Sequence, residues 1–70
     1  MSKMFKLVRT YDDADVLGGE VEEDNVYIKT YGSVLPGHKL PADLEVGETT
    51  LKEYRLSGEK PTVHKIVRVS

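Results

Sequence analysis

The feature that most constrains the fold of this chain is the absence of any sustained helical period. No segment of eleven or more residues repeats its apolar positions every three to four residues. The chain instead contains short runs rich in β-branched and aromatic residues, bounded by Gly, Pro, Asp or Asn. Runs of this kind are typical of β-strands joined by turns. The sequence therefore predicts an all-β fold.

Four runs are the main strand candidates, and they cover residues 4–11, 26–31, 49–56 and 62–69. The run 26–31 alternates most cleanly, with Val26, Ile28 and Thr30 on one face. Gly18-Gly19 and residues 22–25 are turn signals, and residues 57–61 read as a hairpin loop with Pro61 opening the last strand. We expect about five mostly antiparallel strands in a rolled sheet or a small barrel.

Residues 32–47 contain three Gly and two Pro and form one long connection. A structureless loop of that length is uncommon in so small a domain, so we expect it to pack through its apolar residues, Val34, Leu35, Leu40, Leu44 and Val46. Residues 42–45 are expected to form a single helical turn. The predicted core consists of Phe5, Leu7, Val26, Ile28, Leu40, Leu44, Leu51, Tyr54, Val63 and Val67.

Size and composition place the chain in one small domain, residues 1–70. The chain has no cysteine, which excludes disulfides and thiolate sites. Self-association is the usual remaining way to stabilise so small a core, so a homodimer is expected. Apolar runs reach only two or three residues and the N-terminus has no apolar signal segment, so we expect no membrane insertion and a cytoplasmic location.

The charge is strongly uneven along the chain. Seven of the twelve acidic residues fall within thirteen positions, and no Lys or Arg lies between Arg9 and Lys29. The remainder holds ten basic residues against five acidic ones, so a net charge of −2 combines −7 here with +5 elsewhere. Such an uneven charge distribution affects which partners a protein binds rather than which fold it adopts. The seven acidic residues are Asp12, Asp13, Asp15, Glu20, Glu22, Glu23 and Asp24.

Several interpretations of this acidic stretch are open, among them a looser metal site made from Asp12, Asp13, Asp15 and Glu20. A calcium loop starting at Asp13 would match at Asp15 and Gly18, but Leu17 replaces a ligand, Asp24 replaces the terminal Glu, and no helices flank it. An acidic tip could dock on a basic protein surface or imitate nucleic-acid phosphates. A solvated hairpin that protects a strand edge explains the same residues without a ligand.

No grouping of residues indicates catalysis or a cofactor. His38 lies in the Pro/Gly-rich loop and His64 within the last strand, and two histidines are too few for a zinc site. Neither is paired in sequence with a nucleophile, and no glycine motif of the phosphate-binding kinds is present. We therefore expect no enzyme activity, no metal and no cofactor.

Basic residues occur in three of the strand runs and indicate an alternative, nucleic-acid binding. Lys52 shares a face with Tyr54, whereas Arg9 and Arg55 alternate to faces opposite Lys6 and Lys52, so one continuous stripe does not follow. Solubilising strand charges explain the pattern equally well. The candidate nucleic-acid residues are Lys6, Arg9, Lys52, Arg55, Lys65 and Arg68.

The stretch LPADLEVGE at residues 40–48 resembles the Pro-x-x-Leu…Gly-Asp/Glu segment of AbrB-type swapped-hairpin transcription factors. The resemblance implies an intertwined dimer and DNA binding. It covers nine residues and lacks the short helix between the two halves, so it does not establish membership.

The leading hypothesis is a non-catalytic binding or assembly module that works through protein contacts. Tyrosine supplies a large contact area with few rotatable bonds, and it is common at interfaces. The residues expected at such an interface are Tyr11, Tyr27, Tyr31 and Tyr54. The alternative is a small nucleic-acid-binding β-barrel, including a dimeric DNA-binding regulator.

Overall fold

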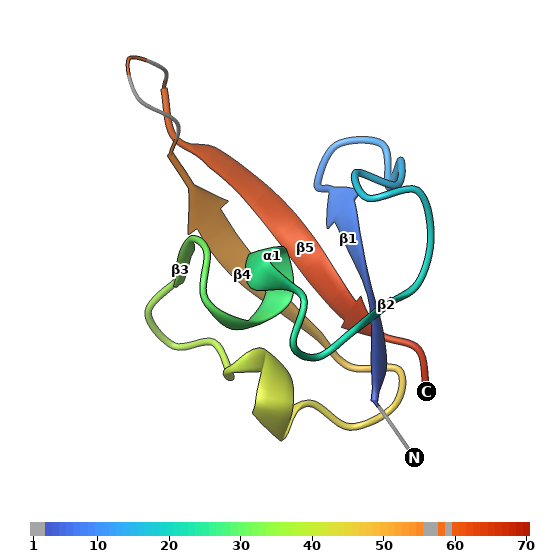
Figure 1. The fold of residues 1–70 in the computed structure, drawn as a ribbon. Helices are drawn as coiled ribbons and strands as arrows, with labels where there is room; N and C mark the ends of the chain where they lie inside the picture. Colours follow the sequence, from blue (N-terminus) through green and yellow to red (C-terminus); the bar gives the residue numbers. More distant parts are fainter. Residues whose placement is uncertain (1–2, 56–57, 59) are drawn as a thin grey trace.

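A computed structural model describes residues 3–55, 58 and 60–70 and contains one five-stranded antiparallel sheet (Figure 1). The strand order is β2-β1-β5-β4-β3, and the sheet does not close on itself. The all-β prediction is confirmed, as a rolled sheet rather than a barrel. The elements are β1 (Met4–Arg9), β2 (Val21–Glu22), α1 (Val26–Lys29), β3 (Ser33–Val34), the 3-10 helix η1 (Pro41–Asp43), β4 (Thr49–Tyr54) and β5 (Thr62–Arg68).

The long strands β1, β5 and β4 form the centre of the sheet. Leu7 of β1 lies opposite Ile66 of β5, which lies opposite Thr50 of β4. All three side chains are buried, because α1 and the connections before and after it pack on this face (Figure 1). We call it the covered face. The other face carries alternate residues such as Lys6 and Lys65, and we call it the open face.

The core lies between the covered face and α1. Five of the predicted core residues are buried, namely Phe5, Leu7, Ile28, Leu44 and Tyr54. The prediction was wrong for Val26 and Leu40, which are 53% and 59% exposed. Leu51, Val63 and Val67 are only half-buried because they belong to the open face. Ile66 is fully buried at the centre of the sheet and was not predicted.

The strand predicted over residues 26–31 is wrong, because residues 26–29 form α1. The Asn25 side chain caps the helix by accepting a hydrogen bond from the Tyr27 amide at 2.9 Å. A strand would have placed Val26 and Ile28 on the same face. The helical turn instead buries Ile28 and leaves Val26 exposed. Short strands at Val21–Glu22 and Ser33–Val34 complete the five-stranded sheet instead.

The connection predicted over residues 32–47 contains β3 and packs in part as predicted. Leu44 is buried and Val34 and Leu35 are half-buried, whereas Leu40 and Val46 are exposed. Its helical turn, η1, begins one residue earlier than expected. Two hydrogen bonds from side chains of β4 and β5 help attach the connection to the sheet: the Thr50 hydroxyl donates to the Lys39 carbonyl at 2.6 Å, and Arg68 donates to the Leu44 carbonyl at 2.8 Å.

The strands β4 and β5 are consecutive antiparallel neighbours, as the predicted hairpin requires. β4 ends at Tyr54, and β5 begins at Thr62, directly after Pro61. Leu56, Ser57 and Glu59, which belong to the predicted strand end and hairpin loop, lie outside the described residues. Among the helices of the described ranges, none has the length and apolar character needed to cross a membrane.

Candidate binding pocket

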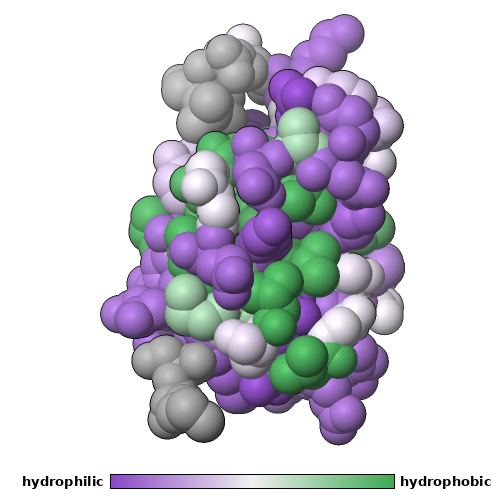
Figure 2. Space-filling model, turned by 90° about the vertical axis from the view of Figure 1, so that its right-hand side faces the viewer, coloured by the Kyte–Doolittle hydropathy of each residue, from purple (hydrophilic) through white to green (hydrophobic). Residues whose placement is uncertain are grey.

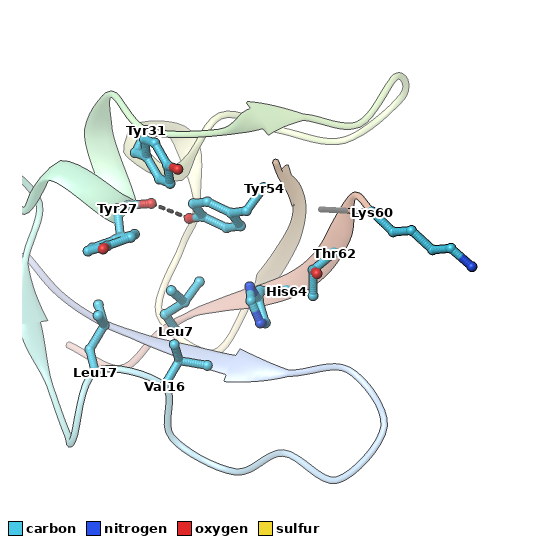
Figure 3. A pocket seen from close by; sticks show the side chains of 9 residues that line it. All are labelled: Leu7, Val16, Leu17, Tyr27, Tyr31, Tyr54, Lys60, Thr62 and His64. Atoms are coloured by element: carbon cyan, nitrogen blue, oxygen red, sulfur yellow. Dashed lines mark hydrogen bonds between the residues drawn. The ribbon is translucent and has the colours of Figure 1, made fainter. Parts of the chain in front are cut away.

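A cavity of about 260 Å³ lies between the covered face, α1 and the segment that follows β1. Figure 3 shows the tyrosines on one side of this space and the aliphatic side chains of Val16 and Leu17 on the other. The residues that line the pocket are Leu7, Val16, Leu17, Tyr27, Tyr31, Tyr54, Lys60, Thr62 and His64.

Three tyrosines from two elements form the aromatic wall of the pocket. Tyr27 belongs to α1 and Tyr31 follows it by four residues, so the two rings meet edge to face with centroids 5.2 Å apart. Tyr54 of β4 packs on both, with ring centroids at 6.1 Å and 5.6 Å. Edge-to-face and tilted contacts at these separations are favourable between aromatic rings. The three rings therefore pack against one another as one wall.

Hydrogen bonds from β4 hold the helix that carries this wall. The Tyr54 hydroxyl donates to the Tyr27 carbonyl (Figure 3), and burial raises the pKa of the phenol well above its usual value. The Lys52 ammonium donates to the carbonyls of Ile28 and Tyr31, each at 2.9 Å. Lys52 is only 3% exposed, and burial lowers its pKa. Both side chains thus fix the position of α1 and its tyrosines.

His64 is the polar group at the base of the pocket. Its strand position lies between Arg9 of β1 and Lys52 of β4, and its ring centroid is 5.4 Å from that of Tyr54. Burial lowers the pKa of the imidazole, and the positive charge of Arg9 lowers it further. The neutral imidazole is therefore favoured. Its Nδ1 is buried and has no hydrogen-bond partner among the residues that the structure describes.

The mouth of the pocket exposes apolar groups. Val16 is 41% exposed and Tyr27 is 38% exposed, from opposite walls. The Lys60 side chain extends away from the other lining residues (Figure 3). Pockets for drug-sized ligands span roughly 300 to 1,000 Å³, so this one matches a small ligand or one large side chain.

The lining residues include one aliphatic hydroxyl and one imidazole, those of Thr62 and His64. The one aliphatic hydroxyl among the lining residues, that of Thr62, has no hydrogen bond to His64. Within residues 3–55, 58 and 60–70, no group of three His, Asp or Glu side chains is placed to hold a metal ion. The exposed His38 lies in the long connection, away from the pocket lining.

The acidic stretch is divided by the structure into two parts. Asp12 and Asp13 lie in the turn after β1: Asp12 accepts two hydrogen bonds from Arg9, at 2.7 and 3.1 Å, and Asp13 pairs with Lys65 at 2.6 Å. The Arg9 hydrogen bonds and the Ala14 amide lower the pKa of the Asp12 carboxyl. The other five acids continue toward α1 and make no ion pair within the described part of the chain; they are Asp15, Glu20, Glu22, Glu23 and Asp24.

Figure 2 shows the side of the molecule on which β1, β2 and the acidic segment lie in Figure 1. Hydrophobic residues gather there in an interrupted patch, surrounded by hydrophilic ones. Apolar and charged surface therefore alternate on this side.

The predicted nucleic-acid residues do not converge on one surface. Lys52 is buried under α1, and Arg68 donates to the carbonyls of Leu44 and Ser70 on the covered side. The other four lie in three places: Arg9 is the last residue of β1, Arg55 lies beyond the end of β4, and Lys6 and Lys65 lie on the open face. Nucleic-acid binding through these residues stays a prediction.

Three of the four tyrosines predicted for an interface line the pocket, whereas Tyr11 is 78% exposed and lies under Arg9. Sequence reasoning did not assign Leu7, Val16, Leu17, Thr62 or His64 to a site. The alternation of β5 places Thr62 and His64 on one face, but nothing in the sequence shows that Leu17 folds over that face.

Comparison with known protein families, with curated proteins and with solved structures gave no match. The pocket is therefore interpreted from its own geometry.

Proposed function

We propose that this chain is a non-catalytic binding module of the cytoplasm, and that its pocket receives an apolar side chain of a protein partner. The observation that carries the proposal is a preformed cavity lined by three mutually packed tyrosines and three aliphatic side chains. Binding energy at protein interfaces concentrates where a large side chain fills such a desolvated pocket.

The rigidity of the wall supports this proposal. Lys52 and Tyr54 fix three carbonyls of α1 and its end, so Tyr27 and Tyr31 need little ordering when a partner arrives. A preorganised site binds more tightly because less conformational entropy is lost on association. The size of the cavity also suits one anchor residue better than an extended ligand.

A matched pair of valine substitutions tests the proposal. Val16→Asp places a charge at the mouth of the pocket, whereas Val46→Asp places one on an exposed loop that does not line it. A partner recovered from the native host by wild-type protein should be retained by Val46→Asp and lost by Val16→Asp. Equal recovery with both variants would show that the pocket does not hold the partner.

A further inference from the structure

We propose that protonation of His64 regulates the pocket: the neutral imidazole admits the apolar anchor of the partner, and the imidazolium releases it. This inference rests on the proposed function and adds its regulation. Three features of His64 carry it, namely its place in the sheet, its unpaired nitrogen and its contact with the cavity.

The register of the sheet places His64 between two cations. Arg9 of β1 and Lys52 of β4 are its direct neighbours across the strands, and residues paired in this way share a face of the sheet. Lys52 directs its ammonium to carbonyls in and just after α1, and Arg9 is paired with Asp12. An imidazolium at His64 would therefore be the middle one of three positive charges in a row, and like charges disfavour it.

The cavity lining supplies no acid to offset this charge. None of the described residues that line the pocket is Asp or Glu. The Tyr54 ring packs on the imidazole, with centroids 5.4 Å apart, and Tyr27 and Tyr31 line the same space from the side of α1. The Lys60 side chain extends away from the pocket (Figure 3). His64 thus faces aromatic groups and cations.

The buried nitrogen of His64 makes the protonated form still less favourable. Nδ1 has no hydrogen-bond partner among the described residues. A neutral imidazole can carry its proton on Nε2 and leave Nδ1 as an acceptor, whereas an imidazolium has an N–H on both nitrogens. Protonation would therefore bury an N–H without an acceptor, which is costly. Burial and the charge of Arg9 lower the pKa of this imidazole in the same direction.

The cavity couples the proton on His64 to the anchor of the partner. His64 lines the space of about 260 Å³, so solvent that enters it can hydrate an imidazolium. An apolar anchor would displace that solvent and leave the charge among Leu7, Tyr54 and the anchor itself. Because an uncompensated buried charge is strongly unfavourable, binding should lower the pKa of His64 further. By linkage, a proton on His64 must weaken the binding of the anchor by the same factor.

The affinity of a short uncharged peptide with a central Trp, measured between about pH 8 and pH 5, tests this coupling. Trp fluorescence reports the binding, because the protein has no Trp. We expect a constant affinity above pH 6.5, the ordinary pKa of histidine, and a decrease at lower pH. Below the pKa of His64 in the free protein, the decrease should approach about tenfold per pH unit.

The two histidines of the chain provide matched variants. His64→Phe keeps a ring against Tyr54 but removes the titrating group, so its affinities at the two ends of the pH range should be equal. His38→Gln removes the exposed histidine of the long connection and should keep the wild-type pH dependence.

An NMR titration of the His64 ring in the wild-type protein is the second measurement. It should give a lower pKa with the peptide bound than without it. This measurement uses the unchanged chain, so it decides the question even where His64→Phe does not fold.

The possible failures are distinguishable. A wild-type affinity that stays constant over the pH range, or that rises as the pH falls, would overturn the regulation and leave the proposed pocket function standing. A pH dependence that persists in His64→Phe, or a pKa that the peptide does not lower, would do the same. The absence of binding at every pH would overturn both the regulation and the proposed function.

Discussion

Two neighbouring side chains of one face of β4, Lys52 and Tyr54, hold α1 against the sheet. Between them they donate hydrogen bonds to the carbonyls of Tyr27, Ile28 and Tyr31. A four-residue helix has little stability of its own, since most helical stability in proteins comes from packing. These two side chains therefore contribute directly to the position of the aromatic wall.

Tyr54→Phe tests the hydroxyl contact. The substitution keeps the ring against Tyr27, Tyr31 and His64 but leaves the Tyr27 carbonyl without its donor. We expect the free energy of unfolding, measured by urea denaturation, to fall by about 1 to 2 kcal/mol. Tyr11→Phe is the control, because Tyr11 is exposed and its change should stay within about 0.5 kcal/mol.

Lys52 should make stability depend on pH in the alkaline range. Burial lowers its pKa below 10.5, so the unfolded chain holds this proton more strongly than the folded one. Stability should therefore rise with pH between the folded pKa and 10.5. Tyr54 acts oppositely: its pKa is raised above 10.0, so its contribution is complete below pH 10 and is lost as pH rises further.

Urea denaturation in the Tyr54→Phe background isolates the contribution of Lys52 to the pH dependence of stability, because the Tyr54 phenol is then absent. As the pH rises toward 10.5, the unfolding free energy should rise with this lysine present and lose that rise in Lys52→Met. An identical pH profile with and without the lysine would contradict the burial of a charged group at this position.

At the level of elements, the tight junction between α1 and β3 depends on Gly32. A Cβ at this position would lie 2.8 Å from two atoms of the Tyr54 ring and 2.9 Å from the Glu53 carbonyl oxygen. Its φ of +75° is also unfavourable for other residues. The glycine therefore lets the end of the aromatic wall approach β4 closely.

Gly37 offers a matched control for this position. Its φ is +84°, but an added Cβ would meet no atom within 4 Å. Gly37→Ala should cost about 1 kcal/mol from its backbone conformation alone. Gly32→Ala should lower the unfolding free energy by about a further 1 kcal/mol or more, because the added methyl group overpacks the site. It should also shift the NMR resonances of the Tyr54 ring. Equal unfolding free energies for the two variants would contradict the close packing.

The strands that carry strong alternation could be predicted from sequence, but α1 could not. Met4–Arg9, Thr49–Tyr54 and Thr62–Arg68 match the predicted runs to within two residues at each end. The run 26–31 alternates as well as they do, and six residues are too few to separate a strand from a helical turn. The decisive contacts come from Lys52 and Tyr54, more than twenty positions away in sequence.

The pocket could be predicted only in part, for the same reason. Tyrosine chemistry indicated the aromatic residues, and alternation placed Lys52 with Tyr54 on one face of β4. The register that brings Leu7 to Ile66, and the fold of Leu17 over them, are long-range features that no local pattern encodes. The burial of Lys52 likewise could not be predicted, because its ammonium donates to backbone carbonyls in and just after α1, far away in sequence.

At the scale of the whole molecule, the sheet separates two surfaces of different character. The covered face carries the core and the pocket, whereas the open face combines half-buried apolar residues with Lys6 and Lys65. Lys65 is already paired with Asp13, so little of the predicted basic surface is left uncompensated there. The homodimer expected from the small size stays a prediction, and sedimentation equilibrium would test it.

Oligonucleotide retention tests the alternative function. Phosphate contacts are strongest at low salt, so a nucleic-acid-binding barrel would retain single- or double-stranded oligonucleotides there. Because Lys52 is buried and the other candidate cations are dispersed, we expect no retention at low salt. Retention that weakens steeply with salt, and that is lost with Lys6→Glu and Lys65→Glu, would restore the alternative.

The central claim is that the tyrosine-lined pocket receives an apolar side chain of a protein partner. The most direct measurement is an NMR titration of isotope-labelled protein with a short peptide that carries a central Trp, a residue the protein itself lacks. Intermolecular contacts from the Trp ring to Leu17 and Tyr27, with shifts at His64, are the predicted result. Shifts confined to the open face, around Lys6 and Val67, with the pocket resonances unchanged, would contradict it.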